Sequence, residues 1–456
     1  MIINSFKNLA LGFFTKGHER TLLAKKNIFF SFILKAIDLG TGLLLVPLVL
    51  NYLDETRYGI WLTLSSLVMW FNFFDVGLGH GLRNKLAESQ AKGDESLSRK
   101  YVSTTYAGIA LISIGFFILF ILTNTFLDWS KILNTTVVPI SELNLLAIIV
   151  FGFFALRLVL KLILSVLLAN QQPAMRDLIQ TSGKVLNLIV IFILLQYTTD
   201  KLLYLGITYS ATPVLLLLIF SIILFASKYK HIAPNYKFVD FSLFNDLFKL
   251  GGKFFLIQIA AVILYTTDNM IITQLFSPAE VTPYNIAHRY FGVLMMGFTI
   301  IVAPYWSAAT EAYAKGEYGW IKHSVRKLVR IWVLVAIALL IMLIFSNKVY
   351  HVWLGEKVRI PFVLSAAWAF FIAIQALNTI FIQIINGTGK VKLQMIIGAI
   401  GAVINIPLSI LFAKYFGLGV VGVIGATIFT QLLAIGFVFI QYKKIVNNNL
   451  TGIWAK

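Results

Sequence analysis

Cysteine is absent from this chain of 456 residues, so disulfide bonds, a thiolate nucleophile and a cysteine-ligated metal site are excluded. Charged residues are scarce, at 12% against about 25% in soluble proteins, and hydrophobic residues reach 59% against roughly 45–50%. A soluble fold cannot cover its surface with so few charges, whereas lipid can solvate an apolar surface. The composition therefore predicts a polytopic membrane protein.

Several signatures of catalysis are also missing. The sequence contains no G-x-x-x-x-G-K-[ST] phosphate-binding loop, and Gly251-Gly252 is typical of a helix start rather than of a dinucleotide site. The six histidines lack the spacing of metal ligands, and the polar connections are too short to fold as a catalytic domain. We therefore expect a protein that is not an enzyme, with no metal site and no cofactor other than a coupling H+ or Na+.

Long apolar segments dominate what is present. A helix needs about 20 apolar residues to cross the hydrocarbon core of a bilayer. Twelve segments meet this length, which predicts an all-α polytopic protein with about twelve transmembrane helices. The predicted spans are residues 27–51, 58–80, 101–124, 142–170, 174–196, 202–226, 250–274, 281–305, 323–346, 359–386, 391–414 and 418–442.

The basic residues predict the orientation of these spans. Lys and Arg number 38 against 19 Asp and Glu, a balance that would suit nucleic-acid binding if the charges were clustered. Most of them instead lie in alternate connections between the spans, as in cytoplasmic loops. We therefore expect both termini in the cytoplasm, a location in the bacterial inner membrane, and no nucleic-acid partner.

Short matches between the two halves predict an internal repeat. They predict an N-terminal six-helix bundle at 27–226 and a C-terminal six-helix bundle at 250–442, with a cytoplasmic linker at 227–249 and a cytoplasmic tail at 443–456. Residues 1–26 would be a cytoplasmic segment, with either an interfacial helix or a frayed tail at 4–16. The matches are Tyr58-Gly59 with Tyr284-Asn285, residues 91–94 with 314–317, residues 185–188 with 403–406, and Leu205-Gly206 with Leu418-Gly419.

Charged residues inside the predicted spans are the candidate functional residues. A charge at the centre of a bilayer costs roughly 2.5–3.5 kcal/mol even on the most lenient scale, so each one needs a reason to be there. Basic residues outnumber acidic ones, and most of the set lies in the first half. The residues are Lys35, Arg157, Lys161, Lys184, Arg289, Asp38, Asp75 and Asp268.

Arg157 and Lys161 predict an anion-binding cavity. Their i, i+4 spacing puts two like charges on one helix face, which is repulsive unless an anion faces them. Lys184 in the next span could join them, and Lys35 and Arg289 are further candidates for the same cavity. The alternative is that Lys161 snorkels to the interface and Arg157 pairs with a carboxylate.

The acidic residues leave alternatives open. Asp38 either forms a local i, i+3 ion pair with Lys35 or carries a coupling ion, and Asp268 is a candidate for gating or ion coupling. Asp75 and Arg83 flank a glycine-rich run and favour a cytoplasmic loop anchor. Arg289 could equally form a structural pair.

Two prolines inside spans are candidate hinges. Pro47 lies in the first predicted span and Pro407 in the eleventh. Each one removes a backbone hydrogen bond from its helix and so permits bending. Proline is nevertheless common in membrane helices, so the pattern alone does not establish a hinge.

Loose motifs along the chain carry a resemblance to a known family. The chain resembles the polysaccharide-exporter branch of the multidrug/oligosaccharidyl-lipid/polysaccharide (MOP) superfamily, the Wzx-type flippases of O-antigen or capsule repeat units. The resemblance covers nearly the whole chain. It rests on Pro47, residues 58–61, residues 75–79 leading to Arg83, residues 386–390, Asn405 and residues 417–422.

The resemblance implies two six-helix bundles that form a V around a cationic central cavity. It also implies alternating-access transport of an undecaprenyl-pyrophosphate-linked oligosaccharide to the outer leaflet, and the pyrophosphate would be the anion held by Arg157, Lys161 and Lys184. Membrane lipids, this lipid-linked substrate, a glycan polymerase and chain-length machinery are the implied partners. Some members of the superfamily carry fourteen spans, whereas this chain is predicted to have twelve. This difference weakens an assignment to the lipid II flippase of peptidoglycan synthesis.

Two alternatives belong to other functional classes. A multidrug and toxin extrusion antiporter would share the architecture, but it needs an acidic cavity for its cationic substrates. Asp38 in the first span is the residue that keeps this alternative open. An integral-membrane glycan polymerase or ligase would need a large extracytoplasmic loop, and the longest outer connection is only residues 125–141.

Overall fold

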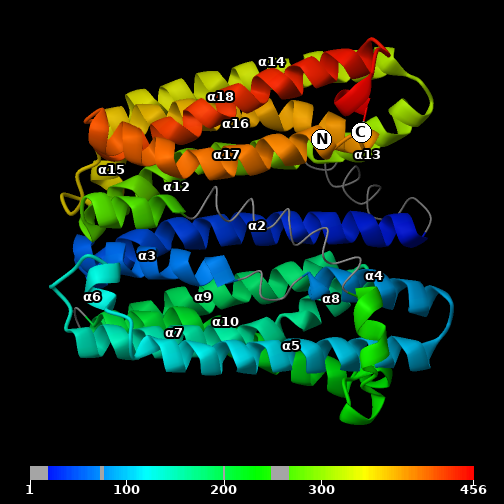
Figure 1. Ribbon diagram of the computed structural model, residues 1–456, viewed down its shortest axis with the longest axis horizontal. Coiled ribbons are helices and arrows are strands. Elements are labelled where there is room, and N and C mark those ends of the chain that lie inside the picture. Colours follow the sequence, from blue (N-terminus) through cyan, green and yellow to red (C-terminus); the bar gives the residue numbers. More distant parts are fainter. Residues whose placement is uncertain (1–18, 72–76, 199–200, 248–266, 456) are drawn as a thin grey trace, which may run out of the picture. The chain divides into compact units, whose positions relative to one another are not determined.

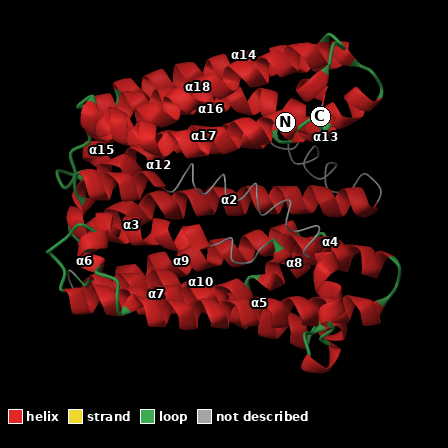
Figure 2. Cartoon of the chain, viewed as in Figure 1, coloured by secondary structure: helices red, strands yellow, loops and turns green. Residues whose placement is uncertain are grey.

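The computed structural model describes residues 19–71, 77–198, 201–247 and 267–455, and all regular structure in these ranges is helical (Figure 2). Ten helical segments in these ranges are long and apolar enough to cross a membrane. The predicted all-α polytopic class is thus confirmed for the described residues. The segments are Ile33–Tyr52, Glu95–Asn124, Ile140–Ala169, Pro173–Tyr197, Leu202–Ala226, Pro278–Ala314, Tyr318–Ile344, Phe362–Thr388, Lys392–Tyr415 and Gly419–Val446.

Two of the twelve predicted spans have no counterpart among these ten segments. The predicted span 58–80 is divided between helices α3 (Glu55–Trp70) and α4 (Leu78–Ala91). Most of the predicted span 250–274 lies outside the described residues, as do the predicted interfacial segment 4–16 and Asp75. The twelve-span count and the cytoplasmic termini therefore stay predictions.

Local sequence explains where several helices begin. The Asp54 carboxylate accepts a hydrogen bond from the Arg57 amide at 2.7 Å, and the Asp94 carboxylate accepts one from the Leu97 amide at 2.8 Å. Such side chains satisfy the free amides of a first helical turn. Helix α4 instead follows Gly77, whose φ of 72° lies in the left-handed region that favours glycine.

The chain forms two compact units. Unit 1 comprises residues 1–52, 72–127 and 141–256, and unit 2 comprises residues 53–71, 128–140 and 257–456. These boundaries differ from the predicted bundles 27–226 and 250–442. The difference arises because α3 and residues 128–140 pack with the second half of the chain.

In unit 1, helix α9 is the central packing partner. Helix α2 packs along its length, and α10 and α8 also contact it (Figure 1). The Phe120 and Phe151 rings stack at 4.1 Å between α5 and α7. The helices of unit 1 are α2 (Glu19–Tyr52), α4, α5 (Glu95–Asn124), α7 (Ile140–Leu160), α8 (Leu162–Ala169), α9 (Pro173–Tyr197) and α10 (Leu202–Ala226), followed by the short turns η2 (Lys230–Ile232), η3 (Tyr236–Phe238) and η4 (Phe241–Leu243).

In unit 2, helix α16 is the centre, because α12, α13, α14 and α18 all pack on it. The Trp332 indole of α14 donates to the Ala373 carbonyl of α16 at 2.8 Å. The elements of unit 2 are α3, α6 (Trp129–Ile132), helical residues 267–275, α12 (Pro278–Val302), α13 (Pro304–Ala314), α14 (Tyr318–Ile344), α15 (Ser346–Leu354), α16 (Phe362–Thr388), α17 (Lys392–Ile410), the π-helical η5 (Leu411–Tyr415), α18 (Gly419–Val446) and η6 (Gly452–Ala455).

The repeated asparagine motif makes the same kind of contact in both units. In unit 1, the Thr212 hydroxyl of α10 donates to the Asn187 amide oxygen of α9. In unit 2, the Asn405 amide of α17 donates to the Thr427 hydroxyl of α18 at 3.0 Å. All four side chains are buried. An equivalent polar bond thus joins equivalent neighbouring helices, which supports the internal repeat.

Helix α3 belongs to unit 2 because Gly59 allows a close backbone approach. A Cβ atom at Gly59 would lie 1.7 Å from the Pro278 carbonyl oxygen at the start of α12. Four residues beyond Pro278, the Thr282 hydroxyl of α12 donates to the Glu55 carbonyl of α3 at 2.8 Å and joins the two helices again. One turn further along α3, the Thr63 hydroxyl lies 2.7 Å from the Thr273 hydroxyl of the helical residues 267–275.

We predict that Gly59→Ala destabilises unit 2, because the atom that the new methyl group meets is a backbone carbonyl and cannot rotate away. Overpacking of this kind typically costs about 1–3 kcal/mol. Thermal unfolding of the purified protein in detergent measures the effect. Gly297→Ala on α12, where a Cβ meets nothing within 4 Å, is the matched control. An unchanged unfolding temperature for Gly59→Ala would contradict the proposed close packing.

Candidate functional site

Unit 1 contains an ion pair between two of the predicted site residues. The Lys184 ammonium of α9 lies 2.7 Å and 2.8 Å from the two carboxylate oxygens of Asp38 on α2. The pair is partly exposed, with 51% of the Lys184 side chain and 26% of the Asp38 side chain accessible. Asp38 therefore pairs across two helices, whereas Lys35, one turn earlier on α2, is exposed and forms no ion pair with a described residue.

Arg157 and Lys161 occupy consecutive turns at the junction of α7 and α8. The Lys161 amide donates to the Arg157 carbonyl at 2.9 Å, and the Lys161 carbonyl accepts from the Leu164 amide at 3.0 Å, so the helical path continues through the junction. The Arg157 side chain is exposed, and within the described ranges no carboxylate pairs with it. The alternative in which Arg157 is neutralised by an acidic neighbour therefore has no support in these ranges.

The Asp38–Lys184 ion pair and the Arg157 and Lys161 side chains form two groups of candidate residues in unit 1. No hydrogen bond or ion pair between described residues joins Arg157 to Lys184, although both belong to unit 1. Arg289, partly exposed on α12, belongs to unit 2. In the structure, Asp38 thus forms an ion pair with Lys184, whereas Arg157 and Lys161 are residues one helical turn apart.

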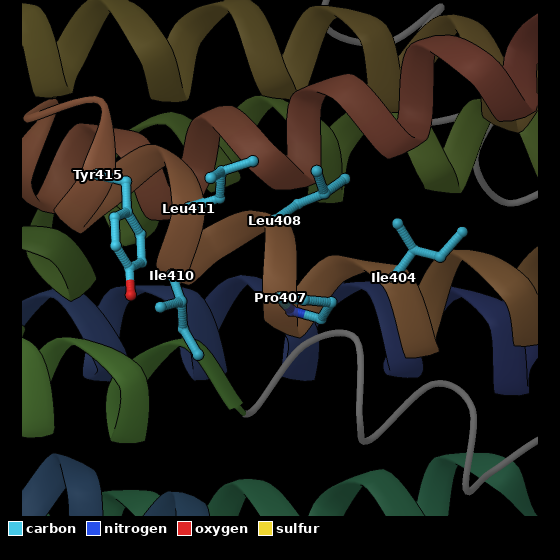
Figure 3. A pocket seen from close by; sticks show the side chains of 6 residues that line it. All are labelled: Ile404, Pro407, Leu408, Ile410, Leu411 and Tyr415. Atoms are coloured by element: carbon cyan, nitrogen blue, oxygen red, sulfur yellow. The ribbon is translucent and has the colours of Figure 1, made fainter.

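The two hinge candidates differ in their surroundings. Pro47 lies within the continuous helix α2, whereas Pro407 lies in α17 just before the π-helical turn η5. Pro407 lines an apolar pocket of about 400 Å³ on this part of unit 2 (Figure 3). The pocket has no charged lining residue, so it offers no positive charge to an anion. It is lined by Ile404, Pro407, Leu408, Ile410, Leu411 and Tyr415.

Unit 2 contains a buried carboxylate with incomplete hydrogen bonding. The Tyr284 hydroxyl of α12 donates to Asp268 Oδ2 at 2.5 Å, while Asp268 Oδ1 has no hydrogen-bond partner in the described structure. The Trp368 indole of α16 packs edge-on against Tyr284 at 5.0 Å, and its Nε1 is likewise buried and unpartnered. An ionised carboxylate in this setting is costly, and a bound proton or cation would remove that cost.

A polar seam runs from this carboxylate toward α3. The Asn269 amide donates to the Ser66 hydroxyl of α3 at 2.6 Å, and the Asn285 amide of α12 donates to the Asn269 amide oxygen at 2.8 Å. Beside it, the His288 ring stacks on Trp368 at 4.5 Å. Asp268 and its neighbour Asn269 thus each hydrogen-bond to α12, and Asn269 also hydrogen-bonds to α3.

Two residues of unit 2, Glu55 and Tyr284, have surroundings that the sequence does not predict. Glu55 precedes the predicted span, and burial, together with the negative charges of Glu280 and Asp54, raises its pKa to about 7. Tyr284 was noticed only as part of a repeat match, and its role as the partner of Asp268 had no local signal. The only hint was the i, i+16 separation, which suits two helices joined by a short turn.

The loop anchor is only partly visible. Arg83 is exposed on α4, and its expected partner Asp75 lies outside the described residues. The pairing of these two residues therefore stays a prediction.

Comparison with known proteins places the chain in a family. The family model described as "Polysaccharide biosynthesis protein" matches residues 24–310, and the MatE model matches residues 254–411. A Salmonella typhi protein named for O-antigen transport is 22% identical over 91% of this chain and 95% of its own length. A Yersinia pseudotuberculosis protein named for O-antigen export is 20% identical over 86% of this chain and 89% of its own length.

Solved structures of membrane transporters share the fold. The inward-facing conformation of a multidrug resistance MATE family transporter of the MOP superfamily matches with a TM-score of 0.75 and 13% identity, over 92% of this chain and 98% of that one. The lipid II flippase MurJ, in its inward closed conformation, matches with a TM-score of 0.71 and 15% identity, over 92% and 90%. The chain therefore belongs to the polysaccharide biosynthesis protein family and is a multi-pass protein of the bacterial inner membrane.

Proposed function

We propose that this protein is a flippase for an undecaprenyl-pyrophosphate-linked oligosaccharide, an O-antigen or capsule repeat unit. It moves this lipid from the inner to the outer leaflet by alternating access, coupled to H+ or Na+. Full-length similarity to proteins named for O-antigen transport and export supports the substrate class. A glycan polymerase and its chain-length machinery would receive the translocated unit.

The observation that carries the proposal is the unpaired guanidinium of Arg157. An arginine within a segment long and apolar enough to span the membrane is expensive unless an anion neutralises it, and the described residues supply none. A guanidinium binds phosphate oxygens through two parallel hydrogen bonds, and Lys161 adds a second positive charge one turn away. A pyrophosphate headgroup would satisfy the Arg157 guanidinium and gain a second positive charge from Lys161.

The Asp38–Lys184 pair offers a way to couple transport to an ion. While Asp38 is ionised, it occupies the Lys184 ammonium at 2.7 Å. A proton or Na+ on Asp38 would release Lys184, which would then be available to the pyrophosphate. Lys35 on the same helix adds positive charge beside the pair. Substrate binding and ion binding would thus be linked through competition for one lysine.

Asp268 is the second candidate for ion coupling or gating. Its unpartnered Oδ1 atom is the natural acceptor for a proton or cation in unit 2. Arg289 follows His288 on α12, close to the hydrogen bonds of Asp268 and Asn269. We assign this basic residue of unit 2 either to substrate contact or to a structural ion pair.

A multidrug cation antiporter remains the second candidate, because the MatE model matches part of the chain. The likeness to MATE structures concerns the fold. A cation pathway would be expected to expose carboxylates, whereas Asp38 is occupied by Lys184 and Asp268 is buried. The exposed Arg157 would repel a cationic drug.

We predict that the double variant Arg157→Gln, Lys161→Gln abolishes translocation of the lipid-linked glycan while leaving membrane insertion intact. Each charge-assisted hydrogen bond contributes about 1.5–3 kcal/mol, so loss of both weakens pyrophosphate binding on the order of a hundredfold or more. Surface glycan in a complemented deletion strain, with membrane abundance on an immunoblot, measures the effect. Lys322→Gln, Arg326→Gln on α14 is the control, with the same spacing and charge change. Normal surface glycan in the first variant would rule out this anion site.

We predict that Asp38→Asn removes the dependence of transport on the coupling ion, because the amide cannot take up a proton and no longer holds Lys184. Binding of the pyrophosphate lipid should become tighter and independent of pH, while net transport falls. Transport in proteoliposomes under imposed proton or sodium gradients measures this. Asp268→Asn, tested in parallel, identifies which carboxylate couples. An unchanged response of Asp38→Asn to pH and sodium would remove Asp38 from the coupling scheme.

A further inference from the structure

Residues 227–247, expected to be a cytoplasmic linker, form a folded strap on helix α5. The Asn235 amide donates to the Ser103 hydroxyl at 3.1 Å, and the Asp240 amide donates to the Thr104 hydroxyl at 2.9 Å. The Asp240 carboxylate also lies 3.4 Å from the Lys100 ammonium. The strap is therefore fastened to α5 by backbone and side-chain contacts along its length (Figure 1).

Aromatic rings complete this attachment. The Arg99 guanidinium of α5 lies 4.2 Å above the Phe238 ring, and its Nε donates to the Ala233 carbonyl at 3.2 Å. The Phe244 ring packs directly on Gly108, where any Cβ atom would lie 2.5 Å from it. Ring and backbone contacts thus fix the strap over the residues 99–108 of α5.

The side chains of the strap that do not pack on α5 include exposed aromatic rings and exposed lysines. Tyr236 is 81% exposed and Phe241 is 54% exposed, although neighbouring rings of the strap are used for packing. Lys228, Lys230 and Lys237 are also exposed. The strap also holds two acidic residues: Asp240 is engaged with Lys100, and Asp246 is exposed near the far end of the strap, close to Lys85 of α4.

The length of α5 sets the depth of the strap. Helix α5 has 30 residues, which corresponds to about 45 Å at 1.5 Å per residue, whereas the hydrocarbon core is about 30 Å thick. The polar first turns of α5, which include Arg99 and Lys100, are the part that extends beyond the hydrocarbon. The strap contacts at Arg99, Lys100, Ser103 and Thr104 fall on these first turns, a position that suits the level of the lipid headgroups for this part of the strap.

We propose that the strap is a binding surface for anionic lipid headgroups of the surrounding leaflet. Lys228, Lys230 and Lys237 contact the phosphates, and Tyr236 and Phe241 insert into the interface, where aromatic rings are favoured. The partner is phosphatidylglycerol or a lipid of the same charge. This surface would anchor unit 1 in the membrane whether or not the proposed flippase function is correct.

The native absence of cysteine allows a direct test of insertion. Single variants Tyr236→Cys and Phe241→Cys, labelled with an environment-sensitive fluorophore, are reconstituted in phosphatidylcholine vesicles with or without phosphatidylglycerol. We expect quenching by headgroup-level nitroxide lipids and a blue shift that requires phosphatidylglycerol. Ala91→Cys, exposed at the end of α4, is the aqueous control. Quenching by aqueous iodide equal to that of the control would overturn the proposal.

A charge variant tests the headgroup itself. Phosphatidylglycerol is titrated into the labelled protein in detergent, and the triple variant Lys228→Gln, Lys230→Gln, Lys237→Gln should raise the midpoint on the order of a hundredfold, given the usual contribution of each lysine near an anionic surface. A second triple variant carries the same charge change in unit 2 and should leave the midpoint unchanged. Equal midpoints for wild type and the strap variant would overturn anionic headgroup binding. The control variant is Lys315→Gln, Lys322→Gln, Lys327→Gln.

Discussion

Hydrocarbon offers no partner for a charge or for a backbone amide, and this constraint accounts for both the fold and the candidate site. It favours helices where the chain crosses the membrane, because a helix satisfies its backbone hydrogen bonds within a single segment. It also requires that each charge within a span be paired or bind a ligand. The structure meets this demand for Lys184 through Asp38, but not for Arg157, and the difference between these two basic residues is the physical basis of the proposed anion site.

The same constraint explains why most of the spans could be predicted from sequence. Hydropathy alone predicted α10 at the bounds it has in the structure, and the predicted span 101–124 ends where α5 ends. It could not predict that the segment 58–80 divides into two helices, because the apolar character continues across the division. Gly77, with its left-handed backbone at the start of α4, marks the second helix but resembles many other glycines in the sequence.

Packing partners were the part of the fold that the sequence could not supply. The repeat predicted that the second span would stay with the first half, yet α3 packs in unit 2 because Gly59 fits against the Pro278 carbonyl. The candidate site shows the same limit. Asp38 had a suitable partner one turn away in Lys35, and only the tertiary structure shows that Lys184 takes it instead. The hydrogen bonds of Asp268 and Asn269 depend in the same way on helices brought together by folding.

We propose that this protein recognises a negatively charged pyrophosphate at bilayer depth. The most direct measurement compares the translocation, in proteoliposomes of the wild-type protein, of two fluorescent polyprenyl oligosaccharides that differ only in their linkage. One carries the pyrophosphate and the other a neutral ether linkage, and appearance in the opposite leaflet is followed by a quencher that does not cross the membrane. The account predicts rapid, protein-dependent movement of the pyrophosphate lipid alone. Equal rates for both lipids would contradict it.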